Sequence, residues 1–548
     1  MLFLKLLQIY INLNGLERFI LMSSIRLLLI HLTHKNYFWE SLFQEPENYR
    51  SLLLDNYPQM KNWIPEEPFR LKPIWPEAPI LDYKWKSSVT AEFIASNLET
   101  PTKILHGFIS AEQVVNELRK GVEENFPYTH VGFSIFVAAY SKFIECAQAV
   151  KEFDKNIITI AGNAGVLFPG TEHYVDYLSK GDGVPFLREL FGEEVNKPYN
   201  LKLIAQDLVF TFFGIKMKMN VVRLVTKLGC PNKCDFCITH QLYNGKATKP
   251  FFTPQQVHDK LVEYRQKIKN KDLTIFFCEP QAIINKNWWY NLFELFEGES
   301  QDYPITLLTS LASIKDFDFD RTVKSSLRFG FVNLGIESFS QDYSKNIKHK
   351  ETKEIIKKLA DYGIGTYATF IIGYDHHTRE SVWKEVQKLV DLDIAQIEIF
   401  NLRPLPETQL WESYKKAGRL LDVPYDFYYI PGFQPFIHPH FKPGFEDMLP
   451  LMYDIYQYFE KERGPSPLSL MKLYSNIPKQ SKKLQKNIKF LKIGANALFP
   501  SWKKYLDPSP IQIENYLTQL GDKSKIPFYI KWLIKSSRLR NFVNYIIK

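Results

Sequence analysis

The sequence has few cysteines and no long apolar run, and these absences exclude whole classes of protein. Five cysteines in 548 residues are too few for a disulfide-stapled secreted fold. A membrane-spanning helix needs about 18 uninterrupted apolar residues, and the apolar N-terminus is broken by Lys5, Asn12, Glu17 and Arg26. No collagen-like period or low-complexity run points to a fibrous or disordered chain. The composition therefore predicts a globular protein of several domains.

A strong excess of one charge sign is also missing. Lys+Arg 69 against Asp+Glu 60 leaves a net charge of +9, which is too diffuse to indicate a nucleic-acid partner. The Lys-rich run 479–492 fits a solvated helix face, and the basic, aromatic tail 526–548 is interpreted as a helix packed on the protein. A peripheral membrane contact of that tail stays open. We expect a cytoplasmic protein, with residues 1–24 as an extension and Met22 as an alternative start.

Strands and helices alternate between residues 26 and 190, which is typical of a parallel sheet built from βαβ units. The predicted strands are 26–32, 102–108, 129–136 and 156–163, with helices at 88–98, 111–126 and 142–153. Glycine-containing turns follow at 161–165 and 180–183, where a parallel sheet binds its ligands. Glycine there permits close approach to a phosphate or a flat ring. Ordinary tight turns explain the same residues equally well.

A second alternating series predicts a sheet that curls toward a barrel, with its chemistry at the carboxyl ends of the strands. The predicted strands are 221–227, 273–278, 305–310, 331–338, 366–373 and 394–401, with helices at 253–270, 352–363 and 379–392. Beyond about residue 430 a Pro-rich loop leads into helical segments. The predicted divisions are 1–24, 25–205, 215–430 and 431–548.

Three cysteines carry the strongest chemical signal. Cys230, Cys234 and Cys237 form a C-x3-C-x2-C loop directly after a predicted strand. Three thiolates on a short loop can hold three irons of a [4Fe–4S] cluster and leave the fourth iron open to a ligand. A structural zinc site with His240 as fourth ligand is the weaker alternative, because such sites usually use paired cysteine knuckles. The histidine pairs 376–377 and 438/440 lie in a turn and a loop, where solvated or hydrogen-bonded histidines are more common than metal ligands.

This loop resembles that of the radical S-adenosylmethionine (SAM) superfamily, and the resemblance covers about residues 215–415. It extends to the segments VNLGIESFS (332–340), TYATFIIGYDHHTRESV (366–382) and NLRPLPETQL (401–410). It implies a partial (β/α)6 barrel that holds the cluster and SAM. It also implies that Phe236 and Gly373 lie near the adenine of SAM, and that Glu337 and Ser338 lie near its ribose and methionine.

The second predicted strand of the barrel departs from the family pattern and ends in Cys278 and Glu279. Glu279 is the only acid there, and a carboxylate would give a charge-assisted hydrogen bond to the SAM ammonium. Cys278 is a candidate to donate a hydrogen atom or to contact the substrate. A small buried thiol is the plainer interpretation of Cys278, since free cysteines are among the most buried residues.

The upstream region is similar to the cobalamin-binding domains that are fused to many radical SAM enzymes. The similarity runs through 129–136, 161–170 and 175–190. It implies a Rossmann-like domain that binds cobalamin along Gly162, Gly165, Gly181 and Gly183. The Asp-x-His-x-x-Gly motif that supplies a lower cobalt ligand is absent from the sequence, so we expect cobalamin without a histidine ligand from that motif.

Together these features predict an α/β chain with a Rossmann-like cobalamin-binding domain, a partial (β/α)6 radical SAM barrel and a mainly helical C-terminal region. The expected reaction is reductive cleavage of SAM to a 5′-deoxyadenosyl radical, followed by C-methylation of an unactivated carbon of a small-molecule substrate. An electron donor of the flavodoxin or ferredoxin type is the expected partner. The alternatives are a cobalamin-assisted oxidation or rearrangement, and an iron–sulfur binding module without turnover.

Overall fold

The computed structural model describes residues 25–32 and 87–463, apart from 213–214, 269–272, 341–346, 363 and 393, together with single positions between 51 and 63. The predicted N-terminal extension, the Lys-rich run 479–492 and the basic tail lie outside the described residues. Within the described part, none of the helices has the length and apolar character to cross a membrane.

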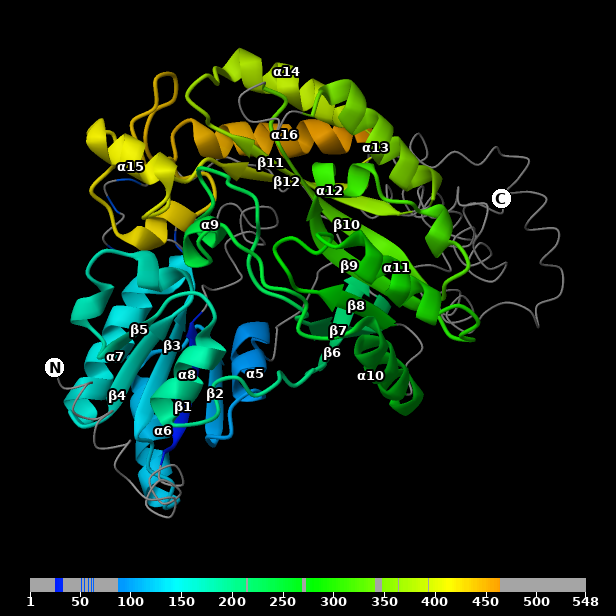
Figure 1. The fold of residues 1–548 in the computed structure, drawn as a ribbon. Helices are drawn as coiled ribbons and strands as arrows, with labels where there is room; N and C mark the ends of the chain where they lie inside the picture. Colours follow the sequence, from blue (N-terminus) through cyan, green and yellow to red (C-terminus); the bar gives the residue numbers. More distant parts are fainter. Residues whose placement is uncertain are drawn as a thin grey trace, which may run out of the picture.

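A five-stranded parallel sheet forms the N-terminal part of the molecule (Figure 1). Its strands are β1 (Leu27–Leu32), β2 (Thr102–Gly107), β3 (His130–Ile135), β4 (Ile158–Gly162) and β5 (Tyr177–Ser179). The order β2-β1-β3-β4-β5 places a topological switch point between β1 and β3, and ligands of such sheets bind at the carboxyl ends beside that point. The predicted Rossmann-like fold is therefore confirmed.

Helices cover both faces of this sheet, which explains why β1 is apolar along nearly its whole length. The helices α5 (Val89–Ala95) and α8 (Gly183–Phe191) pack on one face, against Leu27 and Leu29. The helices α6 (Ala111–Glu123) and α7 (Tyr140–Phe153) pack on the other, against Leu28 and Ile30. The start of α6 follows from the sequence, since Ser110 and Gln113 form a capping box.

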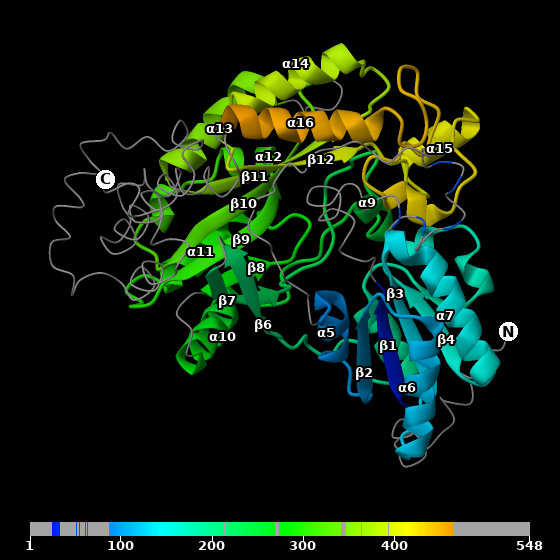
Figure 2. The ribbon, with the colours of Figure 1, turned by 180° about the vertical axis from the view of Figure 1, so that it is seen from behind.

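A seven-stranded open sheet forms the second part, and it curves toward a barrel as predicted (Figures 1 and 2). Six parallel strands lie in chain order: β7 (Ile215–Leu224), β8 (Leu273–Phe277), β9 (Tyr303–Ser310), β10 (Leu327–Glu337), β11 (Gly365–Ile372) and β12 (Gln396–Asn401). The helices of this part are α10 (Pro254–Lys267), α11 (Lys286–Leu295), α12 (Leu311–Lys315), α13 (His349–Asp361), α14 (Arg379–Val390) and α16 (Met448–Arg463). The partial barrel and its six parallel strands are confirmed.

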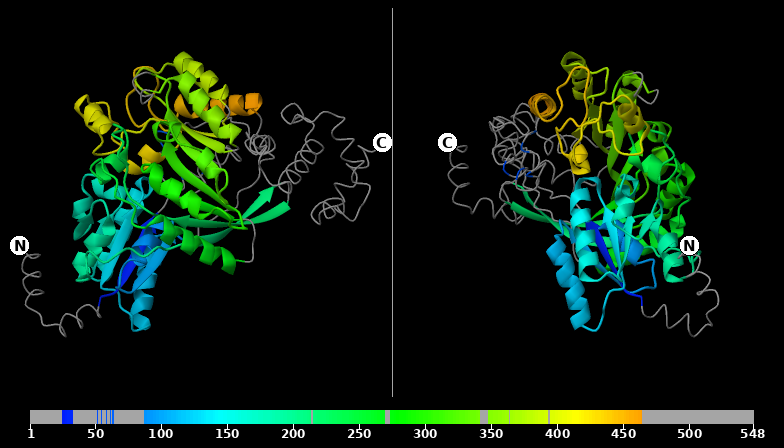
Figure 3. Two further views of the ribbon diagram at one scale, coloured as in Figure 1. Left: turned by 45° about the vertical axis from the view of Figure 1, so that its right-hand side comes forward. Right: turned by 90° about the vertical axis from the view of Figure 1, so that its left-hand side faces the viewer.

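Two strands were not predicted, the short β5 and a strand at the edge of the barrel sheet. β6 (Ile204–Phe212) pairs antiparallel with β7 and adds an edge to the barrel sheet. The sequence interpretation ended the first domain at 205 and began the barrel at 215, so β6 falls mostly between the two predicted units. The paired strands β6 and β7 form the hairpin seen from two further directions in Figure 3.

The two sheets meet around the cysteine loop. The short helix α9 (Ile238–Leu242) follows this loop and lies against the 3-10 turn Ala164–Leu167, beyond the carboxyl end of β4 (Figure 1). The helix α15 (Gln409–Lys416) lies on the same side of the molecule. The carboxyl ends of the strands of the N-terminal sheet therefore face the cysteine loop, which follows the first parallel strand of the barrel.

Candidate functional site

The three clustered cysteines lie on one loop between β7 and α9. All three are partly exposed, and none of the five cysteines of the chain forms a disulfide. The loop starts at Gly229, whose φ of +77° and close approach to the carbonyl of Lys246 leave no room for a side chain. It ends at Cys237, which is the N-cap of α9. Three accessible thiols on a well-defined loop fit the donor set of a [4Fe–4S] cluster.

The same loop is anchored to the far end of the barrel sheet. The backbone N–H of Leu410 donates to the carbonyl of Asp235 at 3.1 Å, which ties the loop to α15. Phe236 packs among apolar side chains that include Ile371 and Tyr374. These residues flank Gly373, so the structure brings the two residues predicted to lie near the adenine of SAM into one neighbourhood.

The other residues predicted to contact SAM end two neighbouring strands. Glu337 and Ser338 close β10, and Gly373 follows β11, which pairs parallel with β10. Glu337 has a φ of +63° and Gly373 a φ of +88°. A non-glycine residue in the left-handed region stores strain that its surroundings must hold. The backbone therefore turns sharply at both strand ends, which lie at the edge of the sheet where barrels bind their ligands.

Glu279 is fully buried and sits under the start of the cysteine loop. Its Oε1 accepts hydrogen bonds from the Thr226 N–H at 2.7 Å and from the Thr226 hydroxyl at 2.8 Å. Burial raises the pKa of Glu279, and the nearby Lys227 ammonium opposes that rise. Its Oε2 has no hydrogen-bond partner among the described residues. A buried carboxylate oxygen without a donor is unusual in proteins, and it is compatible with a cationic ligand group.

Cys278 lies beside Glu279 and lines a cavity between the two parts of the chain. Burial raises the pKa of Cys278 to about 12, so its sulfur is a protonated thiol near neutral pH. The cavity has a volume of about 370 Å³. Its walls include residues from the N-terminal sheet, from α5 and α8, and from the segments before and after the cysteine loop: Leu29, Phe93, Gly132, Ser134, Leu187, Val225, Gly229, Leu242 and Tyr243.

The two predicted glycine turns border this cavity. Gly162, Gly181 and Gly183 all line it, and a side chain at Gly162 would meet no atom nearer than 3.8 Å. Gly165 differs, because it is not among the lining residues and a Cβ there would lie 2.5 Å from Ile135. Three of the four glycines thus line the cavity, whereas Gly165 packs closely against Ile135.

Sequence reasoning missed a polar group at the switch point of the N-terminal sheet. The Nδ1 atom of His31, on β1, lies 2.9 Å from the hydroxyl of Ser134, on β3, and the two side chains share a hydrogen bond. The His31 ring stacks on His106 with 5.5 Å between ring centroids. Burial and the neighbouring His106 lower the pKa of His31 to about 3, so the ring is neutral. In the sequence, the only sign of this polar group is a histidine near the end of an otherwise apolar strand.

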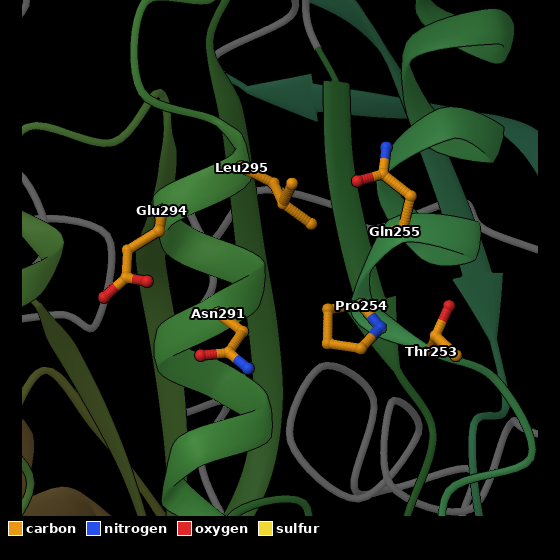
Figure 4. A pocket seen from close by; sticks show the side chains of 6 residues that line it. All are labelled: Thr253, Pro254, Gln255, Asn291, Glu294 and Leu295. Atoms are coloured by element: carbon orange, nitrogen blue, oxygen red, sulfur yellow. The ribbon is translucent and has the colours of Figure 1, made fainter.

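A second, more open groove lies away from these residues, between α10 and α11 (Figure 4). Its volume is about 420 Å³, and Thr253, Pro254, Gln255, Asn291, Glu294 and Leu295 line it. Glu294 is its only titratable side chain, and it pairs with Arg321. The groove thus offers neither a set of metal-binding side chains nor a nucleophile.

A comparison with protein families decides the identity of the barrel. Residues 224–389 match the model of the Radical SAM superfamily. The chain contains a radical SAM domain. Domains of this superfamily bind a [4Fe–4S] cluster and SAM, so the match confirms the resemblance and these two cofactors.

Two curated relatives are similar to part of the chain. An uncharacterized methyltransferase of Pyrococcus horikoshii is 28% identical over 208 residues, or 36% of this chain and 42% of that protein. An uncharacterized methyltransferase of Synechocystis sp. is 28% identical over 204 residues, or 35% of this chain and 37% of that protein. The matches cover less than half of either relative.

Two solved structures show weaker similarity. The radical S-adenosylmethionine methyltransferase TsrM of Kitasatospora setae, solved with cobalamin and a [4Fe–4S] cluster bound, is 14% identical, with a TM-score of 0.49, and covers 78% of this chain and 84% of its own. OxsB, a cobalamin-dependent S-adenosylmethionine radical enzyme solved with aqua-cobalamin and S-adenosylmethionine, is 13% identical, with a TM-score of 0.46, and covers 96% and 75%. The assignment of the radical SAM domain rests on the family match and the cysteine loop.

Proposed function

We propose that this protein is a cobalamin-dependent radical SAM methyltransferase that acts on an unactivated carbon of a small molecule. The observation that carries the proposal is the position of the cysteine loop, which lies between a radical SAM barrel and the cavity at the carboxyl end of a Rossmann-like sheet. The methyltransferase names of the two curated relatives support the same reaction class.

Different residues of the barrel would bind the cluster and SAM. Cys230, Cys234 and Cys237 would hold the cluster, and Glu279 would take the SAM ammonium at its unpartnered oxygen. Phe236, Gly373, Glu337 and Ser338 would surround the rest of SAM, as the family resemblance implies. When bound and reduced by a donor of the flavodoxin or ferredoxin type, the cluster supplies the electron that cleaves SAM to methionine and, after hydrogen abstraction from the substrate, 5′-deoxyadenosine.

The cavity supports a cobalamin site. It opens at the β1/β3 switch point, its walls are mainly apolar, and Gly162, Gly181 and Gly183 leave backbone accessible along it. The apolar volume between the sheet and helices α5 and α8 suits the flat base of a nucleotide tail. The polar Ser134 and Asn163 at its edge suit the amide groups of a large corrin ring. The start of the cysteine loop and α9 contribute Gly229, Thr239 and Leu242 to the same cavity, so these residues would lie beside a bound corrin.

Anaerobic purification of the protein tests the first part of this proposal. Wild-type protein should contain about four irons per chain, and added SAM with reductant should yield 5′-deoxyadenosine, identified by mass. Cys230→Ala, Cys234→Ala and Cys237→Ala should each lose the cluster absorbance and the SAM cleavage together, whereas Cys146→Ala should keep both, because that thiol is buried in the N-terminal core. Full iron content in the triple variant would refute the assignment. Iron without deoxyadenosine would favour a binding module.

A further inference from the structure

A buried hydrogen-bond path joins the ends of β10 and β11 beneath the proposed SAM site. The Gly373 N–H donates to Nδ1 of His377 at 3.0 Å, and Nε2 of His377 lies 3.3 Å from Oε1 of Glu385. The other oxygen of Glu385 accepts from the Ser338 hydroxyl and from the Phe339 N–H, each at 2.8 Å. One histidine and one glutamate therefore connect the turn after β11 to the end of β10.

The side chains of this path are shielded from water. His377 is fully buried, Ser338 is 1% exposed and Glu385 is 7% exposed. Burial would raise the pKa of Glu385, but the hydrogen bonds from His377, Phe339 and Ser338 outweigh it and hold the pKa below its usual value. The Glu385 carboxylate is thus charged, and both of its oxygens take part in hydrogen bonds. Its removal would leave the buried donors of Ser338, Phe339 and His377 without this partner.

The path also fixes the tautomer of His377. A backbone N–H can only donate, so Nδ1 of His377 must be the unprotonated acceptor, and Nε2 carries the proton that faces Glu385. The local fold provides this geometry, because the His377 N–H closes a tight turn onto the Tyr374 carbonyl and Thr378 caps α14. The helix α14 then carries Glu385 back beneath the strand ends.

A metal ion is the competing explanation, since ligand atoms of His376, His377 and Glu385 lie within 4.8 Å of one another. The hydrogen-bond geometry argues against it. Nδ1 of His377 is occupied by a backbone N–H, and one oxygen of Glu385 already receives two donors. A metal held by Nε2 of His377 would displace the proton that links the two side chains.

We propose that His377 and Glu385 are positioning residues, which hold Gly373 and the Glu337–Phe339 segment in the conformation that binds SAM. Glu337 keeps its φ of +63° directly beside Ser338 and Phe339, the two groups that Glu385 binds. The inference rests on the proposed SAM site and adds to it two residues, neither of which is placed against SAM itself. Its expected signature is a loss of SAM affinity without loss of the cluster.

Variants at His377 test the proposal, because they separate its two hydrogen bonds. Asparagine mimics Nδ1 and keeps the bond from Gly373, glutamine mimics Nε2 and keeps the bond to Glu385, and alanine removes both. His377→Ala and Glu385→Gln should raise the KM for SAM in deoxyadenosine formation by about tenfold, as expected for one or two lost hydrogen bonds, with kcat changed by less than about twofold. His377→Asn should fall between wild type and His377→Ala. The exposed neighbour Lys384→Gln should behave as wild type.

Iron content, the thermal midpoint and zinc binding complete the experiment. Unchanged iron with a raised KM supports the positioning role. A lowered thermal midpoint with an unchanged KM would overturn it in favour of a purely structural role, and tight Zn²⁺ binding that His376→Ala abolishes would overturn it in favour of a metal site. If wild-type protein binds no SAM, the proposed function fails and the inference fails with it. If wild type binds SAM and all His377 variants bind it equally well, the inference alone fails.

Discussion

At the scale of single residues, the unpartnered oxygen of Glu279 gives the sharpest prediction. Glu279→Gln keeps the shape of the side chain and its hydrogen bonds with Thr226, but it removes the charge that would bind the SAM ammonium. The dissociation constant for SAM, measured by equilibrium dialysis, should rise by about tenfold or more, since hydrogen bonds to charged groups contribute about 1.5–3 kcal/mol. Iron content should stay at the wild-type value. The exposed Glu297→Gln is the matched control, and wild-type affinity in Glu279→Gln would remove the assignment.

The sequence was sufficient to predict site residues that form a short motif, but not residues whose contacts lie far away along the chain. The cysteine spacing was sufficient because all three thiols lie within eight positions on one loop. His31 pairs with Ser134 across 103 positions, and Glu385 reaches Ser338 across 47 positions, so no local pattern reveals either contact. One histidine of each pair forms a hydrogen bond in the structure: His438 with the Tyr374 carbonyl, and His377 with the Gly373 N–H.

At the scale of elements, the end of β4 and the turn after it contain two glycines with different roles. Gly162→Leu should fill part of the cavity, because no atom would lie within 3.8 Å of its Cβ, while β4 itself stays intact. We expect this variant to retain much less cobalt than wild type after loading with hydroxocobalamin, with a thermal midpoint close to wild type. Gly165→Ala should instead lose about 1–3 kcal/mol of stability, because its Cβ would overlap Ile135. Full cobalt retention in Gly162→Leu would place cobalamin elsewhere.

The parallel strands could be predicted because they are short and regularly spaced between helical segments. In the N-terminal sheet β1 is apolar along nearly its whole length, whereas most barrel strands bury an apolar residue at every second position. The elements that were missed lack such a signal. β5 has only three residues, and β6 is an edge strand that enters the sheet in the opposite direction, next to β7 and without a helical crossover. Packing of α9 against the Ala164–Leu167 turn depends on how the two sheets meet, which the sequence does not encode locally.

At the scale of the whole molecule, a buried carboxylate joins the two parts. Asp426, in the segment after α15, accepts hydrogen bonds from the Ser141 N–H at 3.0 Å and from the Ser141 hydroxyl at 2.6 Å, at the first turn of α7. Aromatic contacts surround the pair, including Tyr425 against Tyr140 and Tyr429 against Phe136. This contact holds the N-terminal part of the chain against the barrel. The cavity lies between these two parts, so its shape depends on contacts of this kind.

The charge of Asp426 makes the stability of the molecule depend on pH in a defined direction. Burial raises the pKa of Asp426 from its usual 3.8 to about 6, so the folded protein holds this proton more tightly than the unfolded chain does. Between pH 4 and 6, the contribution of Asp426 to the free energy of unfolding should fall as the pH rises, by at most ~1.4 kcal/mol per pH unit, and it should stay low above pH 6. Asp426→Asn removes this titration. Urea denaturation from pH 4.5 to 7.5 should therefore show the stability of Asp426→Asn rising relative to wild type as the pH increases, whereas the exposed Asp422→Asn should follow wild type throughout. Parallel curves for Asp426→Asn and wild type would show that this carboxylate does not titrate at the interface.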